Sequence, residues 1–509
     1  MKNVIITGEN LTIHDLIRVS REYAHVELSE TAKNRILESR KIVDDLVENE
    51  KVVYGITTGF GKFSNVSITK DESKILQRNL IITHAVGAGE PFNTETTRAI
   101  ILLRINNLSK GYSGVKLETV MTMIEMLNKR VHPLIPQKGS LGASGDLAPL
   151  SHMVLPMIGL GEAEYNGNFM NGSEAMEKSG IQIIELTSKE GLALINGTQV
   201  MTAVGALAVY DAINLAKAAD IANALEFEAH NGVVDALQAR CHAVRPHKGQ
   251  ISTAATLLQI LEGSRNVSRQ GEVRVQDAYT LRCSPQVHGA SKDAINYVKE
   301  KVEIEMNSVT DNPMIFPDTR EGISAGNFHG QPMALSFDFL GIAIAELANI
   351  SERRIERCVN PALSELPAFL VDKGGLNSGF MIVQYSAASL VSENKVLAHP
   401  ASVDSIPSSA NQEDHVSMGT ISARKAREIL NNARRVVSME LMCACQAIAM
   451  RGNKGLGKGT QAAYDTIRSL VPVLHEDRPL YEDINKCESV LIDGSLIRNV
   501  EETAGELTV

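Results

Sequence analysis

The sequence predicts an all-α protein, in which a long helical bundle follows an N-terminal domain of shorter helices and loops. Aromatic residues make up only 4% of the 509 residues and Trp is absent. The apolar content is mostly Ala, Leu, Ile and Val, which favours a helical core over a large β-sandwich. Three mainly apolar segments, 205–227, 333–357 and 422–450, exceed the usual length of a globular helix. A bundle of long helices explains them most simply.

The N-terminal part alternates shorter helical patterns with glycine-containing loops. Ser29 is placed to cap a helix whose apolar residues, among them Ala32 and Ile36, lie along one face. A loop rich in Gly, Thr and Phe follows at 54–63, and another helix begins near Lys70. Segment 180–196 is expected to be irregular. We therefore expect two domains, residues 1–199 and residues 200–509.

Composition excludes several classes of function. The net charge is −10 and no run of Lys or Arg forms a basic stripe, so nucleic acid is not an expected partner. The N-terminus lacks a long apolar signal region, and no segment long enough to span a membrane is free of charge. The six Cys residues have no framework spacing. They indicate reduced thiols and a cytoplasmic protein.

Three motif-like segments do not support a site. Segment 452–459 nearly matches a phosphate-binding loop, but Gly459 stands where a hydroxyl should bind magnesium, and a helical pattern precedes it. Cys241, His242 and His247 have no second pair of metal ligands at matching spacing. Cys443 and Cys445 lie in an apolar helical run, which is typical of buried thiols. No metal site is expected.

The turn at 142–146 (Gly-Ala-Ser-Gly-Asp) can form an electrophile, which protein side chains lack. The amide nitrogen of Gly145 attacks the carbonyl carbon of Ala143, and loss of two waters closes a five-membered ring. The Ser144 side chain then becomes the exocyclic methylene of a 4-methylidene-imidazol-5-one. Gly145 suits this attack because it has no Cβ and reaches unusual backbone angles. The alternative interpretation is a turn of small residues before a helix that Asp146 caps.

Several other loops concentrate polar or aromatic residues among glycines, which suits a ligand site but also a solvated connection. Gln276, Tyr279 and Arg282 are spaced by three, so that a helical turn would present them on one face. Arg282 there could hold a carboxylate by two parallel hydrogen bonds. The other such segments are Tyr54 with its loop 54–61, His84 in 83–89, Asn196 in 196–198, Phe328 in 326–330, and Glu413 in 411–415.

Taken together, these motifs resemble the histidine ammonia-lyase family of the aromatic amino acid ammonia-lyases, from about Val53 to about Gly419. The shared motifs, in the order of the family, are 54–61, 83–85, 142–150, 196–198, 276–283, 310–313, 326–330 and 412–415. Their joint occurrence leaves a chance match little room.

The resemblance implies a mainly helical homotetramer of the aspartase/fumarase-like superfamily, with active sites built from several subunits. It implies a carbon–nitrogen lyase that eliminates ammonia from L-histidine to give trans-urocanate, the first step of histidine degradation. The electrophile is then the methylidene-imidazolone formed autocatalytically from Ala143, Ser144 and Gly145, without metal or nucleotide. Two accounts stay open, in which it adds to the substrate amine or to the imidazole ring.

By family position, Tyr54 removes the β-proton and Tyr279 contacts the amine or the electrophile. Arg282 is implied to hold the substrate carboxylate, while His84 and Glu413 address the imidazole, whose N–H a carboxylate can accept. The implied catalytic residues are Tyr54, Ala143, Ser144, Gly145 and Tyr279. The implied substrate-binding residues are His84, Asn196, Gln276, Arg282, Phe328 and Glu413.

The family's usual Ser before His84 is replaced here by Thr83, which keeps the hydroxyl. A tyrosine or phenylalanine ammonia-lyase, or an aminomutase with the same electrophile, is the alternative activity. A helical binding protein that retains the motif without the chemistry is the alternative from another class.

Overall fold

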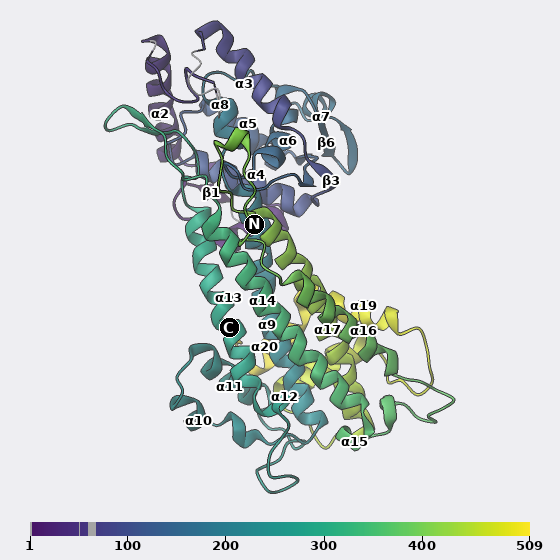
Figure 1. The fold of residues 1–509 in the computed structure, drawn as a ribbon. Helices are drawn as coiled ribbons and strands as arrows, with labels where there is room; N and C mark the ends of the chain where they lie inside the picture. Colours follow the sequence, from purple (N-terminus) through teal and green to yellow (C-terminus); the bar gives the residue numbers. More distant parts are fainter. Residues whose placement is uncertain (1–2, 50, 60–67) are drawn as a thin grey trace. The chain divides into compact units, whose positions relative to one another are not determined.

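A computed structural model of the chain describes residues 3–49, 51–59 and 68–509, and it confirms the mainly helical fold (Figure 1). Each strand within these residues is only three or four residues long. The chain forms two compact units. The first comprises residues 1–207, 299–338 and 400–424, and the second comprises 208–298, 339–399 and 425–509. That the chain has two independent domains, 1–199 and 200–509, stays a prediction.

Four long helices each contribute one end to each unit. They are α9 (Gln199–Ala229), α13 (Ser284–Met306), α14 (Gln331–Val359) and α17 (Gly419–Arg451). Helices α9, α14 and α17 confirm the three long segments expected from the sequence.

The other helices of the first unit are shorter. They are α1 (Ile13–Ser20), α2 (Glu30–Glu48), α3 (Lys70–His84), α4 (Thr94–Leu108), α5 (Leu117–Asn128), α6 (Leu147–Val154), α7 (Gly172–Lys178) and α8 (Glu190–Ile195), with 3-10 turns at η2 (Leu155–Ile158) and η5 (Ser409–Asn411). Polar caps begin several of them: the Ser29 hydroxyl accepts from the Ala32 amide at α2, as predicted, and Thr69 forms a capping box with Glu72 at α3. Helix α4 is buried on all sides, so it forms the centre of this unit.

Small sheets lie between these helices. β1 (Val4–Ile6) pairs in parallel with β2 (Val26–Leu28), in a register that places Val4 opposite Val26. The antiparallel pairs are β3 (Ala88–Pro91) with β5 (Pro136–Lys138), β4 (Val131–Pro133) with β6 (Glu162–Tyr165), β6 with β7 (Asn168–Asn171), and β8 (Met314–Phe316) with β9 (Glu321–Ile323).

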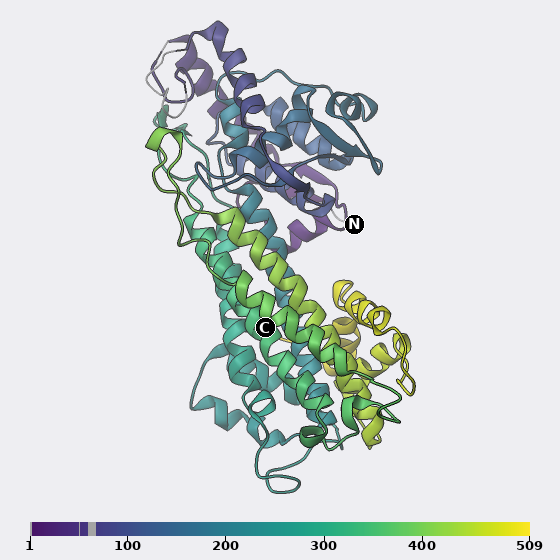
Figure 2. The same ribbon diagram turned by 45° about the vertical axis from the view of Figure 1, so that its right-hand side comes forward.

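The second unit packs helices around the remaining lengths of the four long ones (Figures 1 and 2). Its other helices are α10 (Ala239–Ala243), α11 (Lys248–Ile260), α12 (Tyr279–Arg282), α15 (Pro361–Ser364), α16 (Met381–Leu397), α18 (Lys458–Leu470), α19 (Leu480–Ile492) and α20 (Ser495–Ala504), with η3 (Val234–Leu237) and η4 (Ala368–Leu370).

A buried network of charged side chains joins the long helices inside the second unit. Asp220 on α9 accepts hydrogen bonds from His288 Nδ1 at 2.7 Å and from Lys292 Nζ at 2.6 Å, both on α13. Arg354 on α14 lies 3.2 Å from His288 Nε2 and donates to Glu440 on α17 at 3.0 Å. Burial lowers the pKa of His288, so the neutral ring donates through Nδ1 and accepts through Nε2. All five side chains are fully buried, so each charge depends on its partners.

Some local predictions are confirmed and others are wrong. Segment 452–459 is no phosphate loop, because α17 ends at Arg451 and α18 begins at Lys458, with no strand before the glycines. The segment 180–196 is irregular only in part, since it contains α8. Helix α8 has six residues, all buried, so it shows no amphipathic period. Residues 60–63 of the predicted loop 54–63 lie outside the described residues.

Helices α9 and α14 are long and apolar enough to cross a membrane, by length and composition alone. In the protein, 78% and 67% of their most apolar windows are buried, as is typical of core helices.

We expect Arg354→Met to lower the free energy of unfolding by about 3–5 kcal/mol, because it leaves the Glu440 carboxylate buried without its cation. Urea unfolding followed by circular dichroism measures the change. Arg435→Met is the control: Arg435 lies on α17 with 56% of its side chain exposed and pairs with Glu488. Its effect should stay within about 1 kcal/mol. Equal losses in the two variants would contradict the importance of the buried network.

Candidate active site

The turn that carries the predicted electrophile has an unusual backbone. Ser144 has φ of +56°, and Gly142 and Gly145 on either side both have φ of +81°. A left-handed conformation is costly for a residue with a side chain, and it persists only where the surroundings impose it. Gly142 and Gly145 form an antiparallel bridge that closes the turn. Ala143 packs with Val416 and Met418 in a small buried cluster.

The backbone around Asn196 presses against this turn. Gly145 pairs with Gly197 in a parallel bridge, and the Asp146 amide donates to the Gly197 carbonyl at 2.8 Å. A Cβ atom at position 145 would lie 2.1 Å from the Gly197 oxygen, which no real Cβ tolerates. Only glycine fits at position 145, for a steric reason that adds to its positive φ.

Asp146 connects the turn to two other segments. Its Oδ2 accepts from the amides of Val200 and Met201 at 3.0 and 2.9 Å, and its Oδ1 accepts from the hydroxyls of Ser140 (2.9 Å) and Thr420. Burial raises the pKa of Asp146, and these four donors oppose that shift. The alternative interpretation of Asp146 as the cap of the following helix is half right. It stands at the N-cap position of α6, but its carboxylate caps α9.

A buried cation, Arg104, bonds the Asn196 backbone, and a buried ion pair lies within its electrostatic reach. Arg104, fully buried in α4, donates from Nη2 to the Asn196 carbonyl at 3.1 Å. Lys189 and Asp311, both without solvent exposure, form an ion pair at 2.7 Å. Burial lowers the pKa of Arg104 to about 10, with Asp311 opposing the shift, so it remains a cation at neutral pH. The Asn196 side chain donates to the Asn312 carbonyl at 3.4 Å.

Glu413 lies against the turn. Its Oε1 accepts from the Ser144 hydroxyl at 3.3 Å, and its Oε2 accepts from the Ser408 hydroxyl at 3.0 Å. Backbone hydrogen bonds in both directions between Ser408 and Glu413 hold the loop. The structure therefore brings two of the predicted site residues into direct contact.

His84 ends α3 and interacts electrostatically with Glu413. Its Nδ1 lies 3.2 Å from the Thr83 hydroxyl, which itself donates to the Asn79 carbonyl at 2.8 Å. Because a hydroxyl has one proton, Nδ1 must be the donor, and Nε2 is left as an acceptor. Burial lowers the pKa of His84, which favours this neutral ring.

Tyr54 and Phe328 belong to the same unit as the turn. Tyr54 is half-buried, and Ile56 anchors its loop in a cluster with Ile42, Val43 and Ile315. Phe328 is half-buried in the loop between β9 and α14.

Gln276, Tyr279 and Arg282 belong to the second unit. The prediction that one helical turn presents all three is wrong, because α12 begins at Tyr279 and Gln276 precedes it in irregular backbone. Arg282 instead lies over the Tyr279 ring, 4.8 Å from its centroid, and donates from Nε to the Asp277 carbonyl at 3.2 Å. Tyr279 is 71% exposed.

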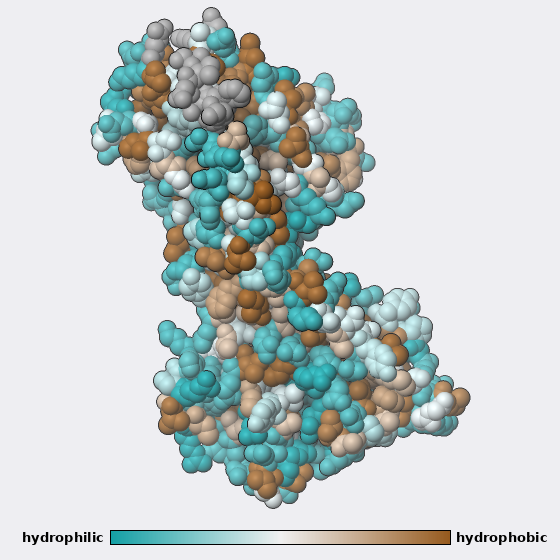
Figure 3. Space-filling view, in the orientation of Figure 1, coloured by the Kyte–Doolittle hydropathy of each residue, from teal (hydrophilic) through white to brown (hydrophobic). Residues whose placement is uncertain are grey.

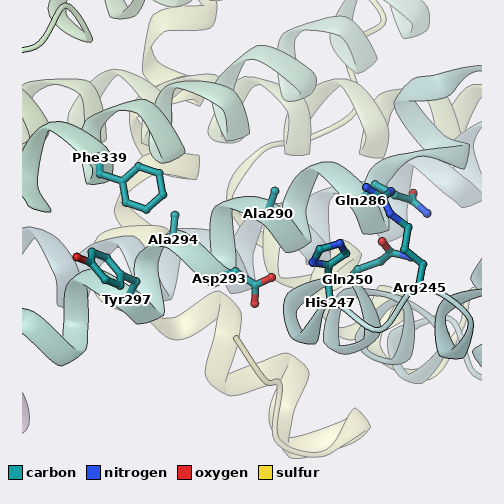
Figure 4. Close-up of a pocket in the computed structure, with 9 residues that line it drawn as sticks. All are labelled: Arg245, His247, Gln250, Gln286, Ala290, Asp293, Ala294, Tyr297 and Phe339. Carbon is teal, nitrogen blue, oxygen red and sulfur yellow. The ribbon is translucent and has the colours of Figure 1, made fainter.

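Each unit contains a hollow. In the first unit, a cavity of about 350 Å³ is lined by residues 137–141 and by Thr420, Ile421 and Arg424, beside the turn. In the second unit, a cavity of about 410 Å³ has Tyr297 and Phe339 at one end and Arg245 and Gln286 at the other (Figure 4). No predicted site residue lines the second cavity.

Sequence reasoning missed the supporting residues Arg104, Lys189 and Asp311. One signal was present for Arg104, a lone charge in the apolar run 99–105, because such residues are rarely buried without a partner. Lys189 and Asp311 are 122 residues apart, and nothing in the sequence joins them.

Comparison with known proteins gives consistent matches. Residues 11–469 match a family described as aromatic amino acid lyase. The chain is 67% identical over 502 residues to a histidine ammonia-lyase of Alkaliphilus oremlandii, covering 99% of both chains. A solved histidine ammonia-lyase from Trypanosoma cruzi has a TM-score of 0.92 at 43% identity, covering 98% of this chain and 95% of that one. A tyrosine aminomutase from Streptomyces globisporus has a TM-score of 0.96 at 38% identity over the whole of both chains.

We expect Arg104→Met to reduce the fraction of chains in which the ring at 143–145 closes, because the Asn196–Gly197 backbone loses its charged donor. Intact-mass measurement gives that fraction, since closure removes the mass of two waters. Arg98→Met is the matched control. Arg98 is also buried in α4 and donates to the carbonyls of Val19 and Leu127, which do not contact the turn.

Both substitutions should destabilise the protein, each by about 1–3 kcal/mol for the unsatisfied groups it leaves. Only Arg104→Met should leave chains in which the ring at 143–145 has not closed. Complete closure in Arg104→Met, or equal loss in both variants, would contradict a specific effect on the turn.

Proposed function

The chain belongs to the aromatic amino acid lyase family, and we propose that it is a histidine ammonia-lyase, which eliminates ammonia from L-histidine to give trans-urocanate. The observation that carries this assignment is that the Glu413 carboxylate contacts Ser144 and interacts electrostatically with the His84 ring, so two groups that can accept an imidazole N–H belong to one site. Both belong to the unit that contains the turn.

The residues present fit the methylidene-imidazolone. The turn is closed by the bridge between Gly142 and Gly145, Ser144 is already left-handed, and position 145 has room for glycine alone. The group supplies an electrophile that withdraws electrons from the substrate. Such an electrophile is needed because the amine is a poor leaving group and the β-hydrogen is only weakly acidic. Ala143, Ser144 and Gly145 provide its atoms. The backbone that follows Asn196 lies against the turn, because Gly197 pairs with Gly145.

His84 and Glu413 explain recognition of an imidazole. An imidazole ring offers one N–H when neutral and two when protonated, and both side chains present acceptors. Ring closure consumes the Ser144 hydroxyl, so Glu413 Oε1 loses that donor and becomes free to accept from the substrate. A phenyl ring would leave both acceptors unpaired, which costs binding free energy.

Tyr54 is the proposed base for the β-proton, and Arg282 the proposed partner of the substrate carboxylate. Arg282 suits that role because its planar guanidinium can form two parallel hydrogen bonds. We further propose that Gln276 and Asn196 support this binding, that Tyr279 contacts the amine, and that Phe328 packs beside the electrophile.

We infer that the active site combines residues of different copies in a homotetramer. Large apolar side chains are exposed on the helices, among them Tyr297 (48%) and Phe339 (44%), and Figure 3 shows apolar residues interrupting the polar surface. Such exposure is typical of a surface that another subunit covers.

The proposed location is the cytoplasm, where the six free cysteines would stay reduced.

An aminomutase is the second candidate, because the tyrosine aminomutase matches over its whole length. The 67% and 64% identities to histidine ammonia-lyases favour the lyase.

Incubation with L-histidine should release ammonia and urocanate, identified by chromatography against standards, while L-tyrosine and L-phenylalanine should react at least about 100-fold more slowly, because they leave polar groups unpaired. Ser144→Ala should retain the fold and lose nearly all turnover, because no methylene can form. A β-amino acid as the main product would replace the lyase with the mutase.

Mixing two inactive variants tests the shared site. Ser144→Ala removes the electrophile and Arg282→Met removes the carboxylate partner, so each alone should be inactive. When the two are co-expressed, mixed tetramers should regain part of the activity, because some sites combine an intact turn with an intact Arg282. The control co-expresses Ser144→Ala with Glu413→Gln, both from the first unit, which should restore much less. Absence of activity in the first mixture, with mixed tetramers verified by mass, would place all the groups within one copy.

A further inference from the structure

A buried cluster in the second unit takes no part in the proposed reaction. Glu226 on α9, His230 just beyond the end of α9, and Cys358 on α14 are all buried, with their ligand atoms within 4.8 Å of one another. Cys358 Sγ lies 3.1 Å from Glu226 Oε2 and 3.5 Å from His230 Nε2, and Glu226 Oε2 lies 3.2 Å from His230 Nε2.

Glu226 is a buried carboxylate without a permanent cation. Within the described part of the chain, its side chain has only Cys358 and His230 as hydrogen-bond or ion-pair partners. Glu228, two residues further on and equally buried, accepts from Asn266, from the Gly457 amide and from Thr460. A buried carboxylate normally needs such donors, a fixed cation or a metal ion.

Two other charged groups interact electrostatically with Cys358: Glu440, and the Arg451 guanidinium, which donates to the carbonyls of Ala229 and Ser364. Glu440 raises the pKa of Cys358 through its charge, but it is bound by Arg354. Burial raises the pKa of the Cys358 thiol well above its ordinary value, so without a metal the sulfur keeps its proton and donates it to Glu226. The cluster therefore brings one carboxylate, one imidazole nitrogen and one thiol sulfur within 4.8 Å of one another.

The distances match those of a tetrahedral zinc site. Zinc binds thiolate sulfur at about 2.3 Å and imidazole nitrogen or carboxylate oxygen at about 2.0–2.2 Å, so its ligand atoms lie about 3.3–3.6 Å apart. The three separations here are 3.1, 3.2 and 3.5 Å. They need to change by only a few tenths of an ångström.

We propose that Glu226, His230 and Cys358 form a buried zinc site with three protein ligands that joins α9 to α14. The ion binds the Glu226 carboxylate, His230 Nε2 and the Cys358 thiolate, and the Cys358 proton is released to solvent. The thiolate and the carboxylate together neutralise the two charges of Zn²⁺, so the occupied site carries no net charge in the helical core. A water molecule supplies the fourth ligand.

The test measures zinc in the untagged full-length protein, expressed with added zinc and dialysed against a chelating resin. Mass spectrometry of the metal should find about one zinc per chain in the wild type, because the site is buried and two of its three protein ligands are anionic when the metal is bound. Cys358→Ser should retain at most about one fifth of it, because a hydroxyl replaces the thiolate. Cys487→Ser is the matched control, since Cys487 on α19 is also a buried thiol, and the charges that shift its pKa belong to Cys445, Asp483, Arg468 and Lys486 rather than to the cluster; its zinc content should match the wild type.

A second measurement uses the wild-type protein, so it does not depend on whether a variant folds. Protein expressed with cobalt in place of zinc should show the near-ultraviolet absorption of a cobalt–thiolate bond. Zinc below about one tenth per chain in the wild type, or zinc that does not depend on Cys358, would overturn the site. Either result would leave the three side chains as a hydrogen-bonded group in which the thiol donates to Glu226. The function proposed above is tested separately, since neither measurement uses histidine.

Discussion

The carboxylate of Asp146 is the constraint on which the rest of the site depends. It binds the first amides of α9 through one oxygen and the hydroxyls of Ser140 and Thr420 through the other. These partners lie on three separate parts of the chain, so one buried anion fixes the turn, the start of a long helix and the start of α17. The positive end of the α9 dipole adds to this stabilisation. A turn held so firmly can keep Ser144 in a conformation it would not adopt alone.

Buried charge organises both units in the same way. In the first unit, Arg104 supports the backbone at Asn196 and interacts electrostatically with Asp311, which pairs with Lys189. In the second, Asp220, Arg354 and Glu440 join helices that lie far apart in the sequence. A buried ion pair contributes little net stability compared with an apolar pair, but it is expensive to break. We therefore expect such pairs to favour one helix register over others, while adding little to the total free energy of unfolding.

Much of the fold could be predicted because it depends on local patterns. The apolar lengths of α9, α14 and α17 and the cap at Ser29 follow from helix period and backbone hydrogen bonding. Helix α8 could not be predicted, because six buried residues carry no period. The turn at 142–146 was recognisable by its small residues. The buried charged residues near the turn could not be predicted, since Lys189 and Asp311 are brought together only by the tertiary fold. The spacing of Gln276, Tyr279 and Arg282 was misleading, because spacing alone does not show where a helix begins.

Glu413 connects formation of the site to its use. In the open chain its Oε1 is occupied by the Ser144 hydroxyl, and its Oε2 by Ser408. The proposed ring closure would remove the first donor and leave the second, so that the carboxylate stays in place while one oxygen becomes available. Glu413 is half-buried, so a substrate N–H could replace the lost hydroxyl as its donor. Under the proposed function, the step that creates the electrophile would thus also create the preference for a ring that carries an N–H. A substitution at Glu413 changes both processes, and only separate measurement of ring closure and of substrate binding can assign its effect.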